Sequence, residues 1–202
     1  MRRAAILVLL AAVVASWAAA SALAGGGRPT SVYVYSPFTN AGALKASIKV
    51  DEKLSGSCFA SSLASRRADA WRCTVANDIY DPCFSDPAGG AAFVVCPEFG
   101  SPPRQVDRID LTAELPAPDN TARSGTTRGL PFALLARPYA GYCDLVTGTA
   151  GTVRGRRVRY DCGLGGSLVG KLNRRPARWT SKLITEGDNP TLYTVRVRIA
   201  WY

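Results

Sequence analysis

Alternation of apolar and polar residues is the commonest pattern in the chain, and it predicts a protein built mainly of β-strands. The pattern is clearest at 191–202, where every second residue from Val195 to Trp201 is apolar and the intervening positions include Arg196 and Arg198. One face of this strand is therefore expected to be buried and the other to be polar and basic. Similar patterns predict further strands at 31–36, 44–50, 92–96, 109–115, 132–137, 139–146, 153–162, 167–172 and 178–185.

One segment departs from the strand pattern. Between Leu63 and Val75 the apolar residues fall at helical spacing, and Ser65 is a candidate N-cap. We therefore expect a short helix that carries Asp69 and Trp71. The expected fold class is α+β, mostly antiparallel β-sheet with one short helix.

The first 24 residues (1–24) have the pattern of a secretory signal. Arg2 and Arg3 give a charged start, an apolar run follows from Ala4, and Ala22-Leu23-Ala24 supplies small residues for cleavage. We expect the signal to be removed, which leaves a mature domain outside the cytoplasm. An uncleaved membrane anchor is the alternative, because the apolar run is long enough to span a bilayer. Both topologies make the rest of the chain extracellular.

A linker-like stretch at 116–129, rich in Pro, Gly, Ser and Thr, coincides with a change of charge. Residues 25–122 hold nine Lys and Arg against eleven Asp and Glu, whereas 123–202 hold fourteen against four. We expect a single exported domain, residues 25 to 202, with a Cys-rich part at 25–115, a loop at 116–129 and a basic, β-rich part at 130–202. Two separate domains flanking the loop are the alternative.

All six cysteines lie after the signal, and an even number in an exported protein indicates three disulfides. The pairing is open, and the least entangled choice is Cys58 with Cys73, Cys83 with Cys96, and Cys143 with Cys162. We expect no metal site, because no two cysteines have the short spacing of a zinc site and the chain has no histidine. The missing histidine also excludes Ser-His-Asp and Cys-His catalysis, so a protein without cofactor or catalytic activity is favoured over an enzyme.

The Cys-rich part carries several motifs that suggest a relationship. They are Gly56-Ser-Cys-Phe59, Asp69-Ala-Trp-Arg-Cys73, Asn77-Asp-Ile-Tyr-Asp-Pro-Cys-Phe84 and Val94-Val-Cys-Pro97. In these motifs the chain resembles an uncharacterised family of exported actinobacterial proteins with no established function. The resemblance implies an exported domain that contains disulfides, and it transfers no active site.

Arginines on two expected strands are the candidate binding residues. Arg157 and Arg159 lie on one face of 153–162, as Arg196 and Arg198 do on the last strand. If these strands share a sheet, four guanidinium groups line one exposed face, and a bound anion would offset their mutual repulsion. A solvated basic surface is the alternative. The expected partner is an anionic cell-envelope polymer or an extracellular protein. Nucleic acid is not expected, because no nucleic-acid-binding motif accompanies the charge.

Two other functions are open. Asp69, Asp78 and Asp81 are candidates for the paired carboxylates of a secreted polysaccharide hydrolase, although ordinary turn and helix roles explain them too. A calcium site from Asp78, Asp81 and Asp86 does not match the spacing of a known loop. The loop Phe99–Arg104, braced by a disulfide, is a candidate contact of an inhibitor or interaction module.

Overall fold

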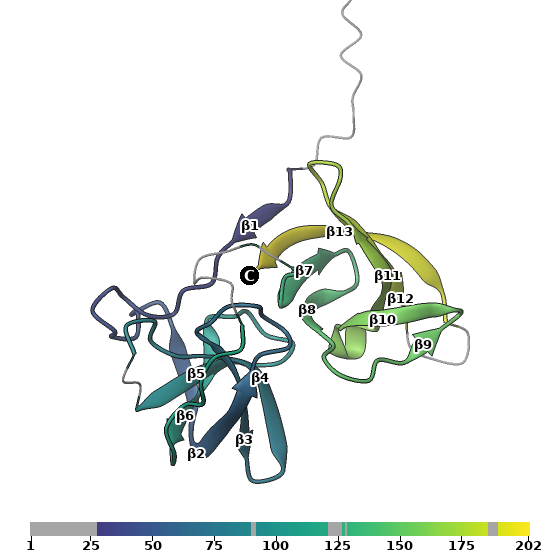
Figure 1. The fold of residues 1–202 in the computed structure, drawn as a ribbon. Coiled ribbons are helices and arrows are strands. Elements are labelled where there is room, and N and C mark those ends of the chain that lie inside the picture. The colour runs from purple at the N-terminus through teal and green to yellow at the C-terminus, as the bar shows by residue number, and fades with distance from the viewer. Residues whose placement is uncertain (1–27, 90–91, 121–126, 128, 186–189) are drawn as a thin grey trace, which may run out of the picture.

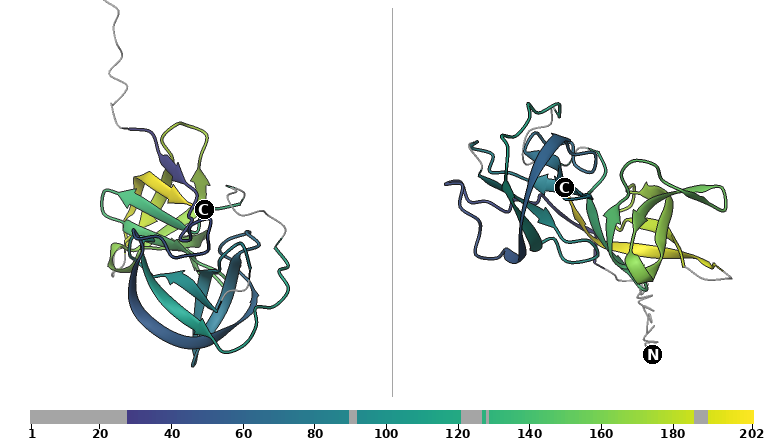
Figure 2. Two further views of the ribbon diagram at one scale, coloured as in Figure 1. Left: turned by 90° about the vertical axis from the view of Figure 1, so that its left-hand side faces the viewer. Right: turned by 90° about the horizontal axis from the view of Figure 1, so that it is seen from below.

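Two small β-barrels make up the described part of the chain, and the C-terminus lies between them (Figure 1). The structure is a computed structural model. It describes residues 28–89, 92–120, 127, 129–185 and 190–202. Two further views show the same two groups of strands, one coloured blue to teal and the other green to yellow (Figure 2).

The first barrel is a meander whose two outer strands meet. Its strands are β2 (Lys49–Ser61), β3 (Ala70–Val75), β4 (Asp78–Phe84), β5 (Phe93–Pro97) and β6 (Gln105–Leu111). Neighbours in sequence pair antiparallel, and β6 closes the ring by pairing in parallel with β2. Closure leaves no open edge along the ring.

The second barrel closes through its last strand. Its strands are β7 (Ala133–Arg137), β8 (Gly141–Leu145), β10 (Arg156–Asp161), β11 (Ser167–Asn173), β12 (Thr180–Ile184) and β13 (Leu192–Trp201). The long strand β13 pairs with β12 along its first half and with β7 along its second half, which completes the ring. Two short strands are added: β1 (Ser31–Tyr33) pairs in parallel with the end of β13, and β9 (Thr152–Val153) pairs with β10.

The expected predominance of antiparallel sheet is confirmed, whereas the expected helix is wrong. The segment Ala70–Val75 is β3, which pairs with β2 on one side and β4 on the other. Cross-strand pairing therefore overrides the local helical spacing. The 3₁₀ turn Gly163–Gly165 is the one helical element in the described ranges, so the fold is mostly β rather than α+β.

Two expected strands differ in their extent. The strand expected at 44–50 begins only at Lys49 and continues to Ser61, through the first cysteine motif. The strand expected at 153–162 is interrupted by a tight turn at Arg154 and Gly155, both of which have positive φ, at 49° and 71°. Such a two-residue turn matches the twist of a hairpin, and here it joins β9 to β10.

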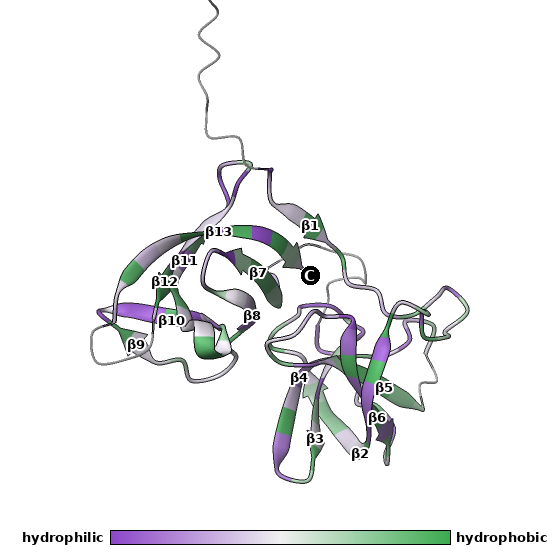
Figure 3. Cartoon of the chain, turned by 180° about the vertical axis from the view of Figure 1, so that it is seen from behind, coloured by the Kyte–Doolittle hydropathy of each residue, from purple (hydrophilic) through white to green (hydrophobic). Residues whose placement is uncertain are grey.

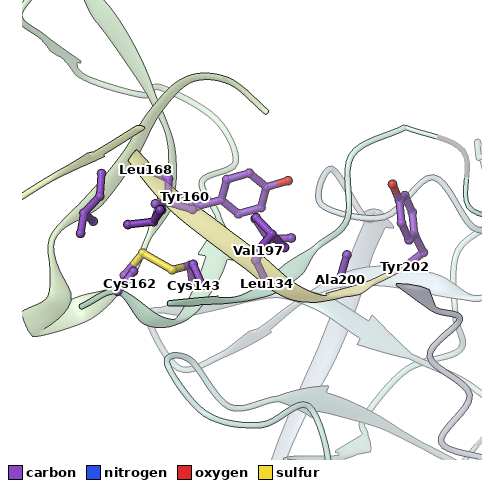
Figure 4. Packing of buried hydrophobic residues seen from close by; sticks show 12 residues of the cluster. Leu134, Cys143, Tyr160, Cys162, Leu168, Val197, Ala200 and Tyr202 are labelled. Atoms are coloured by element: carbon purple, nitrogen blue, oxygen red, sulfur yellow. A yellow bond between two sulfur atoms is a disulfide. The ribbon is translucent and has the colours of Figure 1, made fainter. Parts of the chain in front are cut away.

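The three disulfides join the cysteines in the pairing expected from the sequence. Cys58–Cys73 lies across the paired strands β2 and β3, and Cys83–Cys96 links β4 to β5. In the second barrel, Cys143–Cys162 links β8 to the residue after β10 and packs against the core beside Leu168 and Tyr160 (Figure 4). Disulfides persist in oxidising compartments, so their number indicates an extracellular environment.

A shared core holds the two barrels together. Phe84 of the first barrel and Phe132, which immediately precedes the second, place their ring centroids 5.4 Å apart, and Tyr35 packs on both. Beneath them Arg67 and Asp69 form a buried ion pair at 2.6 Å. Arg67 also donates hydrogen bonds to the main-chain oxygens of Tyr35 and Tyr202. The barrels therefore form one packed unit across this cluster.

The expected signal, residues 1–24, lies outside the described residues. Within the described ranges, no helix has the length and apolar character needed to cross a bilayer.

Candidate anion-binding site

Closure of the second barrel separates the four arginines that were expected to share one face. Strands β10 and β13 belong to the same sheet, but β11 and β12 lie between them on one side and β8 and β7 on the other. In a closed ring of six strands these positions are opposite one another, so their outer faces point in different directions. The expectation of a single row of four guanidinium groups is therefore wrong, because the open sheet it assumed is a barrel.

Arg198 instead lies in a hollow with two other arginines. The hollow, of about 540 Å³, opens where β1, β7 and β13 meet, and we call it the arginine hollow. Its lining residues are Arg28, Pro29, Ser31, Leu135, Arg137, Arg198 and Ile199. None of these described residues is acidic, so the hollow concentrates positive charge. Figure 3 shows the banding of hydrophilic and hydrophobic residues along β13 that produces this outer face.

The geometry of the hollow follows from the pairing of β13. Arg137 stands directly opposite Arg196 on the ladder between β7 and β13. Beyond this pair the register shifts between Val197 and Ile199, which is a β-bulge. Bulges re-aim side chains locally, and here Arg198 and Ile199 both line the hollow.

Thr30 holds in place the N-terminal segment whose residues Arg28, Pro29 and Ser31 line one side of the hollow. Its hydroxyl donates to the main-chain oxygen of Val197 at 2.7 Å and accepts from the main-chain N–H of Trp179 at 2.8 Å. Its own N–H donates to the main-chain oxygen of Ala177. The segment that carries Arg28 is thereby tied to β13 at the bulge, so Arg28 is held beside the other two arginines.

Within the part of the chain that the structure describes, no ion pair neutralises the arginines of the hollow. Four ion pairs are present among the described residues, and none of them involves Arg28, Arg137, Arg196 or Arg198. The position of Arg137 directly opposite Arg196 on the ladder is unfavourable, because like charges that face each other destabilise a sheet. Sequence reasoning missed Arg28 and Arg137. Arg137 is the last residue of the expected strand 132–137, but no local feature of the sequence indicates that this strand pairs with β13.

The arginines of β10 have other surroundings. Arg157 donates to the main-chain oxygen of Gly148 at 3.4 Å, at the base of the β9–β10 hairpin. Arg159 lines a smaller hollow of about 180 Å³ with Lys171 and Arg174. Arg174 is already engaged, since it donates to Tyr202 Oη and to a main-chain oxygen, each at 2.9 Å. The arginine hollow is therefore the larger of the two hollows, and the smaller one includes an arginine, Arg174, whose guanidinium group is already hydrogen-bonded.

A third cavity, of about 410 Å³, is acidic, and we call it the acidic cleft. Its acidic lining residues are Asp81, Glu98 and Asp107 of the first barrel and Asp144 of the second. Burial raises the pKa of Asp144 to about 6, against the hydrogen bond that its carboxylate accepts from the N–H of Gly100 at 2.8 Å. Burial also raises the pKa of Asp107, and neighbouring carboxylates, Glu52 first among them, raise it further.

Two carboxylates considered for catalysis have structural partners. Asp69 pairs with buried Arg67, and Asp81 accepts hydrogen bonds from the hydroxyl of Ser62 and from two main-chain N–H groups that follow it. Asp81 also lies 3.4 Å from Arg72. No group of three acidic, Cys or His side chains within the described ranges has the geometry of a metal site. Phe99, in the loop expected to form an interaction site, is 58% exposed at the rim of the acidic cleft.

Fold and site define a disulfide-stapled protein of two β-barrels with a basic hollow on the second barrel. Comparison of the chain with protein-family models, with curated proteins and with solved structures found no match. The resemblance to exported actinobacterial proteins therefore stays a prediction from the sequence motifs.

Proposed function

We propose that this protein is an exported, non-catalytic module that binds an anionic component of the cell envelope through the arginine hollow. The observation that carries the proposal is the convergence of Arg28, Arg137 and Arg198 on one cavity that has no acidic residue among its described lining residues. Arginine binds phosphate and carboxylate through two parallel hydrogen bonds, and three guanidinium groups around one cavity suit a polyanion. Disulfides and the signal-like sequence 1–24 support a site of action outside the cytoplasm.

The proposal is tested with two variants of equal net charge. In the first, Arg137→Gln and Arg198→Gln remove the charge of two of the three arginines that line the hollow. In the second, Arg156→Gln and Arg157→Gln remove the same charge from the β9–β10 hairpin, on the other side of the barrel. Binding of inorganic polyphosphate is measured by calorimetry, and retention on isolated cell walls is measured as salt is raised.

We expect the hollow variant to bind polyphosphate roughly tenfold or more weakly, because each charge-assisted hydrogen bond contributes about 1.5–3 kcal/mol. The hairpin variant is expected to bind nearly as the parent protein does. Equal losses in both variants would mean that net charge alone attracts the anion, and retention that is insensitive to salt would exclude the electrostatic mechanism.

The acidic cleft favours a second candidate function, a secreted hydrolase of polysaccharide. A carboxyl group whose pKa is near 6 is suited to act as a general acid, and Asp107 in the same cleft is the candidate for the second carboxyl group. This candidate predicts that the purified chain releases sugar from wall polysaccharide and that Asp144→Asn and Asp107→Asn each abolish the release. Absence of release by the parent protein would exclude it.

A further inference from the structure

Three chain reversals lie together at one end of the second barrel. Because consecutive strands of the ring run antiparallel, the turns after β7, β10 and β12 share one end, and the connections after β8 and β11 share the other. The turn after β10 touches both of the others: a Cβ at Gly165 would lie 2.5 Å from the main-chain oxygen of Ala140, and a Cβ at Gly166 would lie 2.2 Å from that of Ile184. Glycine at these two positions therefore packs the turns into one surface. We call this surface the barrel end, and its described residues are 138–140, 162–166 and 190–193.

Each of the three turns of the barrel end carries an exposed apolar side chain. Leu164 is fully exposed, Tyr139 is 73% exposed and Tyr193 is 41% exposed. Tyr193 faces Leu183 on the inner side of β13, but the barrel ends there, and the ring of Tyr193 has its centroid 5.7 Å from that of Tyr139. Leu164 buries no surface in the fold. Exposed apolar surface of this kind marks an interaction site.

Basic residues follow on the outer face of the strands that lead to the barrel end. Arg137 is the last residue of β7, and Arg196 stands opposite it on β13. Lys182 lies two residues before the end of β12. All three side chains are exposed, and none takes part in an ion pair within the described ranges. At about 3.3 Å per residue they lie within about 10 Å of the turns, so the apolar tip has a basic rim.

We propose that the barrel end inserts into the surface of a lipid bilayer that contains anionic lipids, with the basic rim at the level of the headgroups. The inference goes beyond the proposed function, because none of the three apolar residues lines the arginine hollow. Leucine favours the acyl-chain region, and tyrosine rings favour the interface between acyl chains and water. Lysine and arginine next to the apolar residues complement the negative charge of the headgroups.

The form of the barrel end favours a bilayer over a small ligand. Tyr139, Leu164 and Tyr193 project from turns and line neither the two basic hollows nor the acidic cleft. Asp161, the acidic residue that ends β10, accepts a hydrogen bond from the main-chain N–H of Gly163 at 2.9 Å. Residues 186–189 lie outside the described residues and are not part of the proposed surface.

Tryptophan fluorescence identifies the part of the chain that enters the bilayer. The new tryptophan of Leu164→Trp lies on the barrel end, and that of the matched control Phe99→Trp replaces an exposed aromatic residue in the β5–β6 loop of the first barrel. The full chain and both variants are mixed with vesicles of equal parts phosphatidylglycerol and phosphatidylcholine, with and without brominated acyl chains that quench tryptophan. We expect the added emission of Leu164→Trp to shift to shorter wavelength and to be quenched, whereas that of Phe99→Trp stays unchanged.

Co-sedimentation with the same vesicles separates the apolar and electrostatic contributions. Leu164→Ser should weaken vesicle binding roughly tenfold, the scale of burying one leucine, and should keep the affinity for polyphosphate, which shows that the fold is intact. Lys182→Gln combined with Arg196→Gln should lose most of the preference for these vesicles over pure phosphatidylcholine. The hairpin variant, Arg156→Gln with Arg157→Gln, removes the same charge at the opposite end of the barrel and should keep that preference.

Three results would overturn the inference. The first is that the tryptophan at 164 is not quenched, which includes the case in which the expected signal, residues 1–24, binds the vesicles by itself. The second is equal quenching of the tryptophans at 164 and 99. The third is a dimer of the parent protein that Leu164→Ser abolishes, without insertion, which would assign the barrel end to a second copy. Failure of the proposed function has a different signature, namely that the parent protein does not bind polyphosphate.

Discussion

Neutralising Asp144 is expected to stabilise the protein at neutral pH. Its carboxyl lies in the acidic cleft directly across the β8–β10 ladder from Asp161, and burial followed by that neighbour raises its pKa to about 6 from an ordinary value of 3.8. Because the folded pKa is raised, the folded protein binds more protons than the unfolded chain between about pH 4 and pH 6. The free energy of unfolding therefore falls as pH rises through this window, and the loss is complete above it.

The magnitude follows from the difference in pKa. At about 1.4 kcal/mol for each pH unit, moving the pKa from 3.8 to about 6 corresponds to roughly 3 kcal/mol at neutral pH. The amide of Asp144→Asn is uncharged and keeps an oxygen that accepts the N–H of Gly100. We expect this variant to exceed the parent protein in unfolding free energy by about 2–3 kcal/mol at about pH 8 and to equal it near pH 4.

Urea denaturation followed by tryptophan fluorescence at a series of pH values measures this difference. Asp110→Asn is the matched control, because Asp110 is half-exposed and pairs with Arg108 at 2.6 Å. It should lower stability slightly at neutral pH, which is the opposite sign. The reasoning is refuted if Asp144→Asn is no more stable than the parent protein at about pH 8, or if its gain persists at about pH 4.

Three further predictions concern the fold and are checked by the same urea titrations. Arg67→Ala should lower the unfolding free energy by about 3–5 kcal/mol, because it removes the partner of the buried Asp69 carboxylate; a loss below about 1 kcal/mol would contradict this. Arg154→Asn should raise it by up to about 1 kcal/mol, since Asn suits the positive φ of the β9–β10 turn, and any loss would count against that conformation. Replacing Cys143 and Cys162 by Ala should cost about 3 kcal/mol, the loop-entropy value for a separation of 19 residues, and unchanged stability would contradict the bond.

Strand content and disulfide pairing could be predicted from the sequence because both leave local signals. The alternation in β13 reports one buried and one exposed face, and Val195 and Val197 are buried as that pattern requires. The short separations of 13 to 19 residues within the cysteine pairs reflect joins between neighbouring strands. The segment Ala70–Val75 was misread as helix because its spacing fits both periods, and only the pairing with β2 and β4 decides between them.

The site could be predicted only in part. Arg196 and Arg198 follow from the alternation of a single strand. Their neighbours Arg28 and Arg137 do not, because they reach the hollow through barrel closure and through pairing between segments more than fifty residues apart in sequence. Like-charged residues on two strands were expected to share a face, and the missing information was the curvature that closes the sheet. Closure is a property of the whole barrel that no single strand encodes.

The arginine hollow is tested most directly by observing its side chains while an anion binds. Arginine side-chain Nε–Hε signals are assigned in the full chain and followed by NMR during titration with pyrophosphate. The account predicts that the signals of Arg28, Arg137 and Arg198 shift together along one saturable curve, while those of Arg156 and Arg157 stay in place. Shifts spread evenly over all five arginines, or concentrated on the β9–β10 hairpin, would contradict a binding site in the hollow.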